Sequence, residues 1–279
     1  MEPYRAVIPQ VVRVAVGRSD WRASPLLVLA RTWGMKKTAL AQQLAVVAGF
    51  ESPQAGLEQY PTPPELAAHL IHVADLLGDV EDRTVIDLGT GTGMLALGAA
   101  LRGPAEVVGI DLDGGALRIA RENRRRVGTT TPISWVRGDV ARPPLDARTD
   151  DDRGGDASDE RQPTADRSTA GQPTTDRSAV GRSMTDRSVT VVMNPPFGAQ
   201  NTNEHADRAF LETTSRVADV SYSVHNRGSR EFVEAFVADG GGEVTQGFRA
   251  EISLPRQFDF HGEETKELDV EVFRIAWSD

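Results

Sequence analysis

Residues 84–95, TVIDLGTGTGML, decide the fold that the rest of the chain must build. The first five residues have the apolar, β-branched character of a short buried strand, and the next five form the turn GTGTG (residues 89–93). Glycine lets a backbone turn tightly and come close to a ligand. The spacing is G-x-G-x-G behind Asp87, whereas dinucleotide-binding turns have G-x-G-x-x-G. The stretch therefore predicts a strand, a ligand-binding turn and a helix in succession.

The same alternation of strand and helix continues after this turn. A helix is predicted over residues 93–103, and a second strand, AEVVGIDLD, over residues 105–113. A second helix over residues 115–128 and a third strand over residues 131–140 follow. Repeated strand–helix–strand units of this length indicate a parallel sheet with helices on both faces.

The chain resumes this pattern at TVVMNPPFG, residues 190–198, which predicts a fourth strand. Helices are predicted over residues 207–217 and 229–238, and the strand VADVSYSVH lies between them at residues 217–225. The tail over residues 242–277 contains two strands with no helix between them, which indicates an antiparallel hairpin. The predicted fold is α/β and Rossmann-like, with a seven-stranded, mostly parallel sheet and a C-terminal antiparallel hairpin.

Two segments are expected to lie outside this fold. Residues 1–34 contain no convincing element, so we expect an N-terminal extension that adds nothing to the fold. The domain then spans residues 35–279 and begins with helices predicted over residues 35–50 and 65–77. Residues 146–188 are rich in Asp, Arg, Ser, Thr and Pro and contain the related decamers QPTADRSTAG and QPTTDRSAVG. Such a segment buries too little apolar surface to offset its ordering entropy, so a disordered insertion is predicted, with an RNA-binding arm as the alternative.

The composition excludes several classes of protein. The chain has no cysteine, which excludes disulfides, thiolate metal sites and cysteine nucleophiles, and it has no apolar stretch long enough to cross a membrane. These features predict a cytoplasmic protein without a metal site. The formal net charge of -10 argues against nucleic-acid binding, but an acidic surface is also expected of a protein adapted to a salty cytosol. The local distribution of charge therefore carries more weight than the total.

Three strand ends carry carboxylates that would meet at one edge of the sheet. Asp87 lies at the end of the first strand, Asp111 at the end of the second, and Asp139 with Val140 at the end of the third. A carboxylate at Asp111 can accept hydrogen bonds from both hydroxyls of a ribose, and the third strand end would meet an adenine edge and face. Together these strand ends resemble the S-adenosylmethionine site of the Rossmann-like class I methyltransferases. A dinucleotide site is the alternative, although the third glycine that accommodates its pyrophosphate is missing.

The end of the fourth strand, Asn194-Pro195-Pro196-Phe197, resembles the catalytic motif of amino-methylating enzymes. In such a motif the side-chain oxygen of Asn194 and the backbone oxygen of Pro195 accept the two N–H groups of an exocyclic amine. The nitrogen lone pair is then aimed at the methyl donor. The prolines fix the backbone, and Phe197 offers a face on which a planar base can stack. A plain strand end followed by a loop would explain the prolines but not the Asn and the Phe.

Three groups of enzymes use this motif: adenine-N6 methyltransferases, cytosine-N4 methyltransferases and the glutamine methyltransferases of release factors. The flanking segments are LEQYPTPPELAAHLIHVA (57–74), DLGTGTGML (87–95), NPPFG (194–198), SYSVH (221–225) and residues 254–277. From about residue 35 onward the chain resembles the methyltransferase-like protein 5 family of rRNA adenine-N6 methyltransferases. This resemblance implies S-adenosylmethionine-dependent N6-methylation of an adenosine in small-subunit rRNA. Methylation of a protein glutamine at N5 and a non-catalytic RNA-binding scaffold remain the alternatives.

The resemblance also implies the residues of the site and the partners. The residues that would hold the cofactor are Gln59, Thr62, Asp87, Gly89, Gly91, Thr92, Met94, Asp111, Asp139 and Val140. Tyr222 and His225 would lie near the catalytic face, with a packed structural histidine as the alternative for His225. Candidate contacts to RNA phosphates are Arg124, Arg125, Arg126, Arg227 and Arg230, for each of which a solvated surface arginine is the alternative. The implied partners are rRNA or the small ribosomal subunit, and a small zinc-binding activator subunit that covers an apolar sheet edge and carries the zinc itself.

Overall fold

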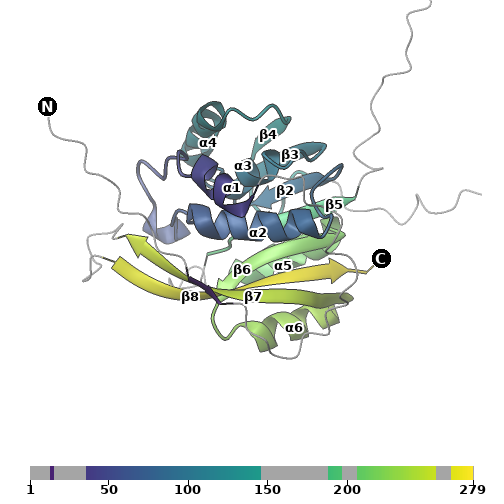
Figure 1. The fold of residues 1–279 in the computed structure, drawn as a ribbon. Coiled ribbons are helices and arrows are strands. Elements are labelled where there is room, and N and C mark those ends of the chain that lie inside the picture. The colour runs from purple at the N-terminus through teal and green to yellow at the C-terminus, as the bar shows by residue number, and fades with distance from the viewer. Residues whose placement is uncertain (1–12, 16–35, 146–187, 197–205, 256–264, 279) are drawn as a thin grey trace, which may run out of the picture.

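The computed structural model describes residues 13–15, 36–145, 188–196, 206–255 and 265–278. Eight strands form one sheet in the order β1-β7-β8-β6-β5-β2-β3-β4 (Figure 1). The strands are β1 (Arg13–Ala15), β2 (Thr84–Leu88), β3 (Glu106–Asp111), β4 (Ile133–Arg137), β5 (Val189–Met193), β6 (Val220–Asn226), β7 (Gly242–Pro255) and β8 (Thr265–Trp277). The α-helices are α1 (Lys37–Leu44), α2 (Pro64–Leu76), α3 (Met94–Ala100), α4 (Gly114–Val127), α5 (Ala206–Val217) and α6 (Arg230–Asp239).

Strand direction divides the sheet into a parallel and an antiparallel part. β2 is parallel to β3 and β5, β3 to β4, and β5 to β6. β8 is antiparallel to both β6 and β7. The seven predicted strands are β2 to β8, and the last two form the predicted hairpin. The prediction of a Rossmann-like, mostly parallel sheet with a C-terminal antiparallel hairpin is therefore confirmed.

β1 is an eighth strand that the sequence did not predict. It pairs antiparallel with β7, with Arg13 opposite Glu251 and Ala15 opposite Arg249. The prediction that residues 1–34 add nothing to the fold is therefore wrong for these three residues. The physical reason is that the outer edge of β7 carries unpaired backbone groups, which an extended segment can satisfy. The rest of the predicted extension, and the predicted insertion up to residue 187, lie outside the described residues.

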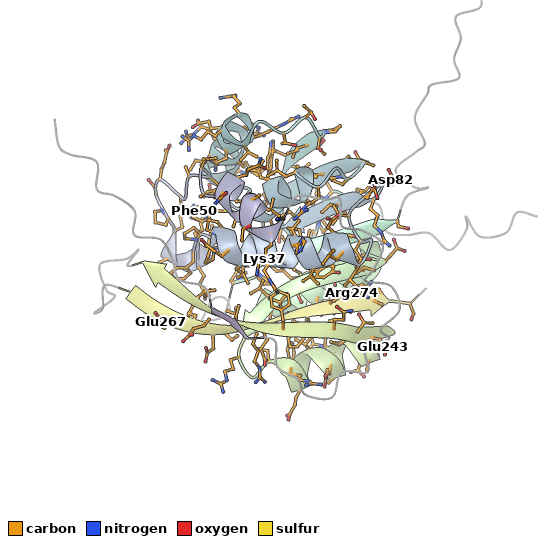
Figure 2. The ribbon with its side chains drawn as sticks, viewed as in Figure 1. Lys37, Phe50, Asp82, Glu243, Glu267 and Arg274 are labelled. Carbon is orange, nitrogen blue, oxygen red and sulfur yellow. The ribbon has the colours of Figure 1, made fainter. Side chains whose placement is uncertain are left out.

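Two apolar layers, one on each face of the sheet, form the core. Buried side chains of α1, α2 and α3 pack against one face, and those of α5 and α6 pack against the other. β5 shows the alternation that separates the layers, because Val192 belongs to the first layer and Val191 and Met193 to the second. Figure 2 shows side chains filling the space between the sheet and its helices. The two layers hold the strands rigidly, so their carboxyl ends are fixed relative to one another.

Residues at the ends of α2 and α4 fix the loops beside the carboxyl edge of the parallel strands. α2 begins with Pro64 as its first residue, where a missing backbone donor costs nothing, and Pro63 before it is extended. α4 is capped by Asp113, whose Oδ1 accepts a hydrogen bond of 2.8 Å from the backbone N of Gly115. The helix ends at Val127, and Gly128 after it has a φ of 74°, which suits glycine. Asp113 is thus fixed in the loop directly after β3.

Candidate active site

The carboxyl ends of β2, β3, β4 and β5 and the loops after them line a pocket of about 270 Å³. A smaller pocket of about 40 Å³ adjoins it, since Gly89, Gly91 and Asn194 line both. All ten residues predicted to hold the cofactor line one or both pockets: Gln59, Thr62, Asp87, Gly89, Gly91, Thr92, Met94, Asp111, Asp139 and Val140. The fold thus brings together three strand ends and the segment before α2.

The glycine turn needs glycine for its conformation and for space. Gly89 and Gly91 have φ values of 68° and 54°, in the left-handed region that side chains disfavour. A Cβ atom at Gly91 would lie 2.9 Å from the ring of Phe50, and one at Gly89 would lie 2.9 Å from the ring of Phe210. Both rings line the larger pocket. The turn at the carboxyl end of β2 therefore passes between two aromatic rings.

Asp87 fixes the inner side of the turn and is itself buried. Its Oδ2 accepts hydrogen bonds of 2.7 Å from the hydroxyl of Thr90 and 2.9 Å from the backbone N of Ala96. Burial raises the pKa of its carboxyl from 3.8 to about 7, and these hydrogen bonds only partly oppose the shift. Near neutral pH this carboxyl can therefore exist in both protonation states beside the smaller pocket.

Asp111 joins the turn to the loop after β3. Its Oδ2 accepts a hydrogen bond of 2.7 Å from the backbone N of Gly91, and its Oδ1 accepts one of 2.8 Å from the backbone N of Asp113. Burial raises the pKa of Asp111, while these backbone donors oppose the shift. The carboxylate is held rigidly at the pocket wall and keeps lone pairs for a ligand.

The segment before α2, residues 57–60, lines the larger pocket together with the strand ends. The side-chain amides of Gln59 and Gln54 donate to Asp113 Oδ2 over 2.8 and 3.1 Å. The backbone N of Gln54 in turn donates to Gln59 Oε1 over 2.8 Å. Gln59 therefore ties this segment to the loop after β3, and its predicted place at the site follows from that contact.

Sequence reasoning missed several residues that line the pockets. They are Phe50, Leu57, Tyr60, Leu112 and Phe210, all in the lining of the larger pocket. Leu112 had a signal, because it directly follows Asp111 and an apolar side chain that is 52% exposed at a strand end suits contact with a ligand. Leu57 and Tyr60 also had one, because they lie in the LEQYPTPP segment that carries the family resemblance, whereas Phe50 comes from an irregular segment with no periodic pattern.

Asn194 follows β5 directly and lines both pockets. Its Nδ2 donates a hydrogen bond of 3.0 Å to the hydroxyl of Thr62. Its Oδ1 is buried and has no hydrogen-bond partner among the described residues. Pro196 lines the larger pocket, whereas Pro195 is buried and does not line it, and Phe197 lies outside the described residues. The carboxamide thus has a satisfied donor and an unsatisfied acceptor beside the pocket.

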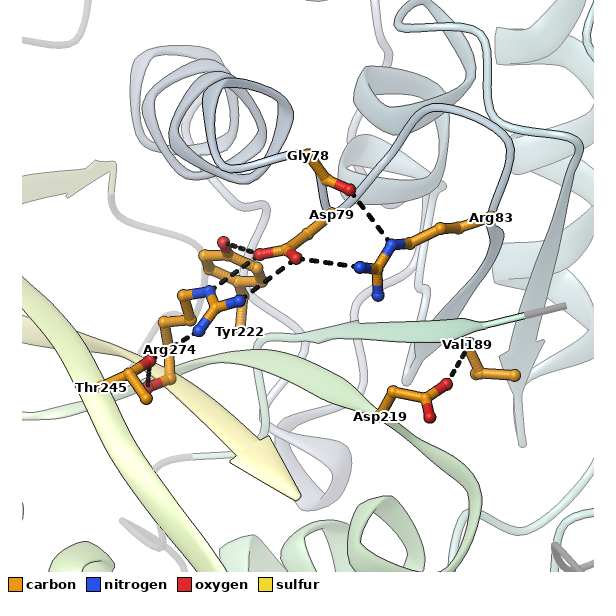
Figure 3. Close-up of polar contacts among 8 residues, drawn as sticks. All are labelled: Gly78, Asp79, Arg83, Val189, Asp219, Tyr222, Thr245 and Arg274. Atoms are coloured by element: carbon orange, nitrogen blue, oxygen red, sulfur yellow. Dashed lines mark hydrogen bonds and ion pairs between the residues drawn. The ribbon is translucent and has the colours of Figure 1, made fainter. Parts of the chain in front are cut away.

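Tyr222 has a structural role, and the prediction that it lies near the catalytic face is wrong. Its hydroxyl donates a hydrogen bond of 2.6 Å to Asp79, in the connection between α2 and β2 (Figure 3). Arg274 of β8 donates to the same carboxylate over 2.8 Å, and Arg83 lies 3.4 Å from it. Burial and the Asp79 carboxylate raise the pKa of Tyr222. Because side chains alternate along β6, Tyr222 faces the layer of α2.

His225 fits the alternative of a packed structural histidine. It is buried, and its Nε2 lies 2.8 Å from the hydroxyl of Ser223. Burial lowers the pKa of its imidazole from 6.5 to about 4, so the ring is neutral at neutral pH. It does not line either pocket described above.

Most of the candidate arginines already have partners within the chain. Arg227 is paired with Asp269, and Arg230 with Glu234. Arg126 donates to Asn123, and Arg124 donates to backbone carbonyls beside β4. Arg125 lines a separate open groove between α4 and β4. Their predicted contacts to RNA stay predictions.

Two other features are absent from the described part of the chain. No described helix is long and apolar enough to span a membrane. Within the same residues there is no group of three or more His, Asp or Glu side chains arranged to hold a metal ion.

Comparisons with known proteins agree with this geometry. Residues 71–144 match the family model of the ribosomal protein L11 methyltransferase, PrmA. An uncharacterized protein of Methanocaldococcus jannaschii is 32% identical over 86% of this chain and 94% of its own length. Mettl5 of Drosophila melanogaster, named an rRNA N(6)-adenosine-methyltransferase, is 28% identical over 86% of this chain and 96% of its own.

A solved structure extends the similarity to three dimensions. PH1948 of Pyrococcus horikoshii superimposes with a TM-score of 0.67 and 31% identity, covering 88% of this chain and 99% of that one. The matches to these two relatives and to this structure span most of each chain. The protein is an S-adenosylmethionine-dependent methyltransferase with a class I fold, and the chain belongs to the methyltransferase-like protein 5 family.

Proposed function

We propose that the protein methylates the exocyclic N6 amine of an adenosine in small-subunit rRNA. The observation that carries this proposal is the buried, unpartnered Oδ1 of Asn194 beside the pocket. An unsatisfied buried acceptor is costly unless a ligand supplies the donor, and an exocyclic amine supplies two. Relatives of similar length, including Mettl5 of Drosophila melanogaster, are named rRNA N(6)-adenosine-methyltransferases.

The residues around the pocket fit S-adenosylmethionine. Gly89 and Gly91 line the pocket without a side chain, in a positive-φ conformation that other residues disfavour, so a ligand can lie against bare backbone. Asp111 would accept hydrogen bonds from the ribose hydroxyls, and Asp139 with Val140 would contact the adenine. Asp87 and Thr62 line the smaller pocket, which suits the polar amino-acid end of the cofactor.

The motif after β5 would orient the substrate amine. When bound, S-adenosylmethionine supplies a methyl group made electrophilic by its sulfonium. Asn194 Oδ1 and the Pro195 carbonyl oxygen would accept the two N–H groups of the amine, which turns the nitrogen lone pair toward that methyl group. Thr62 holds the carboxamide in the required orientation through its hydroxyl. His225 does not line the pocket, and no strong base is needed because the amine loses its proton after it becomes cationic.

Two partners belong to the same proposal. The first is rRNA or the small ribosomal subunit. The second is a small zinc-binding activator subunit, which would cover the free edge of the sheet at β4, the terminal strand in the sheet order. A solubly expressed chain that is monomeric and fully active without a second subunit would refute the activator. The cytoplasmic location stays a prediction.

Nucleoside mass spectrometry of rRNA from a deletion strain tests the function. The strain should lose N6-methyladenosine at one position, and the wild-type gene should restore it while Asn194→Ala should not. Loss of methylglutamine from a protein, with rRNA methylation intact, would instead favour the glutamine alternative.

Purified variants test the role of Asn194 and its orientation. Asn194→Ala should retain cofactor affinity and lower kcat by about 100-fold, because contacts made in the transition state are lost. Thr62→Val should lower kcat by about two- to tenfold, the value of one hydrogen bond. Thr129→Val is a matched control, since its hydroxyl binds the Ala100 carbonyl away from the pocket. A full kcat in Asn194→Ala would remove the basis of the proposal.

A further inference from the structure

Helix α5 holds the loop that follows β4, where the adenine of the cofactor is proposed to bind. The hydroxyl of Thr213 donates a hydrogen bond of 2.7 Å to the backbone carbonyl of Val140, across 73 residues of chain. Thr213 is only 1% exposed and Val140 only 8% exposed. Val140 lines the larger pocket, whereas Thr213 does not. Thr213 therefore acts on the pocket through the backbone of another residue.

The direction of this hydrogen bond is fixed from the other side. Arg216 Nη2 donates to Thr213 Oγ1 over 3.1 Å, so the hydroxyl oxygen serves as an acceptor there. Its single proton is then free to point only toward Val140. The two contacts together hold one rotamer of Thr213 against the loop.

The other bonds of the loop are short-range or lead to β3. The backbone N of Gly138 donates to the Asp111 carbonyl over 3.0 Å, and the backbone N of Ala141 donates to Asp139 Oδ1 over 2.9 Å. The second bond orients the peptide between Val140 and Ala141 relative to Asp139, but neither bond ties that peptide to the opposite wall of the pocket. The bond from Thr213 does, because α5 also carries Ala209 and Phe210, which line that wall.

We propose that Thr213 is a positioning residue for the cofactor, holding the Val140 peptide at the distance from α5 that the adenine requires. This inference rests on the proposed cofactor site at Val140. Without the hydroxyl, the Val140 carbonyl would be buried and unpaired, and the loop would shift to satisfy it. The adenine contact would weaken, while Asn194 and the amine that it holds would be unaffected.

The test compares three variants of the full chain by isothermal titration with S-adenosylmethionine and with adenosine. Thr213→Val keeps the shape but lacks the hydroxyl, and its affinity for both ligands should fall by about tenfold. Thr213→Ser keeps the hydroxyl and should bind as the wild type does. Thr214→Val is the matched control, because the hydroxyl of Thr214 binds the Phe210 carbonyl of the same helix over 2.8 Å and lies 3.6 Å from the Met193 sulfur, and makes no hydrogen bond to the described residues of the loop after β4. Its affinity should stay unchanged.

Kinetics separate positioning from a merely structural role. In Thr213→Val the KM for S-adenosylmethionine should rise by about tenfold with kcat nearly unchanged. A fall in kcat with unchanged KM, equal losses in Thr213→Val and Thr214→Val, or no rescue by Thr213→Ser would overturn the inference.

A second variant covers the case in which Thr213→Val does not fold. Arg216 is exposed, so Arg216→Met should fold, and it frees the Thr213 hydroxyl to rotate. Its KM for S-adenosylmethionine should rise by about two- to threefold, and an unchanged KM would overturn the inference. The titration of the wild type tests the proposed cofactor site separately. If the wild type does not bind S-adenosylmethionine, both the cofactor site and the role of Thr213 are overturned. If the wild type binds tightly and the variants bind equally well, only the role of Thr213 is overturned.

Discussion

Ionisation of Asp87 should make the ligand-free protein less stable as the pH rises toward neutrality. Asp87 is 1% exposed, and burial raises its pKa from 3.8 to about 7. Between these two values the folded state holds a proton that the unfolded state has released. The stability that this proton contributes is therefore complete below pH 3.8 and is lost progressively until the pH passes about 7.

The magnitude follows from the shift. Each pH unit between the two pKa values changes the free energy of unfolding by about 1.4 kcal/mol. Between pH 5 and pH 8, about two pH units lie below the raised pKa of Asp87. Ionisation of Asp87 should therefore lower the free energy of unfolding by about 3 kcal/mol over this range. His69 and His225 act in the opposite direction, because their pKa values are lowered from 6.5 to about 4 and the unfolded state gains protons as the pH falls through that range. The two effects must be separated by a variant.

Asp87→Asn provides that separation. The variant keeps the size of the side chain and one acceptor for Thr90 and Ala96, but it has no proton to lose. Urea unfolding of the wild type and the variant at pH 5 and pH 8 gives a double difference in which the histidine contributions cancel. A double difference of about 3 kcal/mol is expected. A value below about 0.5 kcal/mol would mean that Asp87 is already ionised in the fold at pH 5, and the burial argument would be refuted.

Two further substitutions have defined outcomes. Gly91→Ala should lower the free energy of unfolding by about 1–3 kcal/mol and weaken S-adenosylmethionine binding. The alanine would have to adopt a φ of 54°, and its Cβ would lie 2.9 Å from the Phe50 ring. Denaturation and titration of the same sample measure both, and an unchanged affinity would contradict the close approach. Asp79→Ala should lower the free energy of unfolding by about 3 kcal/mol, because Arg274 loses its buried partner. The affinity for the cofactor should stay unchanged. A loss of affinity without a loss of stability would instead connect this network to the site.

The parallel core of the fold was predictable because its signals are local. Each of β2 and β3 is a short apolar run followed by a helix, and parallel pairing of such units leaves little choice of topology. The same rule explains the site, since Asp87, Asp111 and Asp139 lie at the carboxyl ends of strands that any such sheet places at one edge. Placing these three carboxylates around the adjoining pockets therefore required no knowledge of side-chain contacts, whereas Gln59 and Thr62 were expected only from the resemblance to the family.

The errors concern contacts between distant parts of the chain. β1 is three residues long, and its pairing depends on the outer edge of β7, which no pattern in residues 1–34 encodes. Tyr222 lies on a strand whose residues are buried on both faces, so alternation alone does not say which layer it enters. Its partner Asp79 lies 143 residues away. Such choices are settled by packing between layers.

The Asn-Pro-Pro stretch after β5 does more than fix a backbone, because it also determines which kind of group can bind. Two successive prolines remove two backbone N–H donors from this part of the pocket wall, while their carbonyl oxygens remain. The Asn194 amide donor is taken by Thr62, so the motif presents acceptors to the pocket and few donors. A keto oxygen placed there would meet only acceptors and stay unpaired, whereas an amine would satisfy two of them. On this argument the enzyme should discriminate strongly against guanosine in place of the target adenosine, even before base pairing or RNA shape is considered.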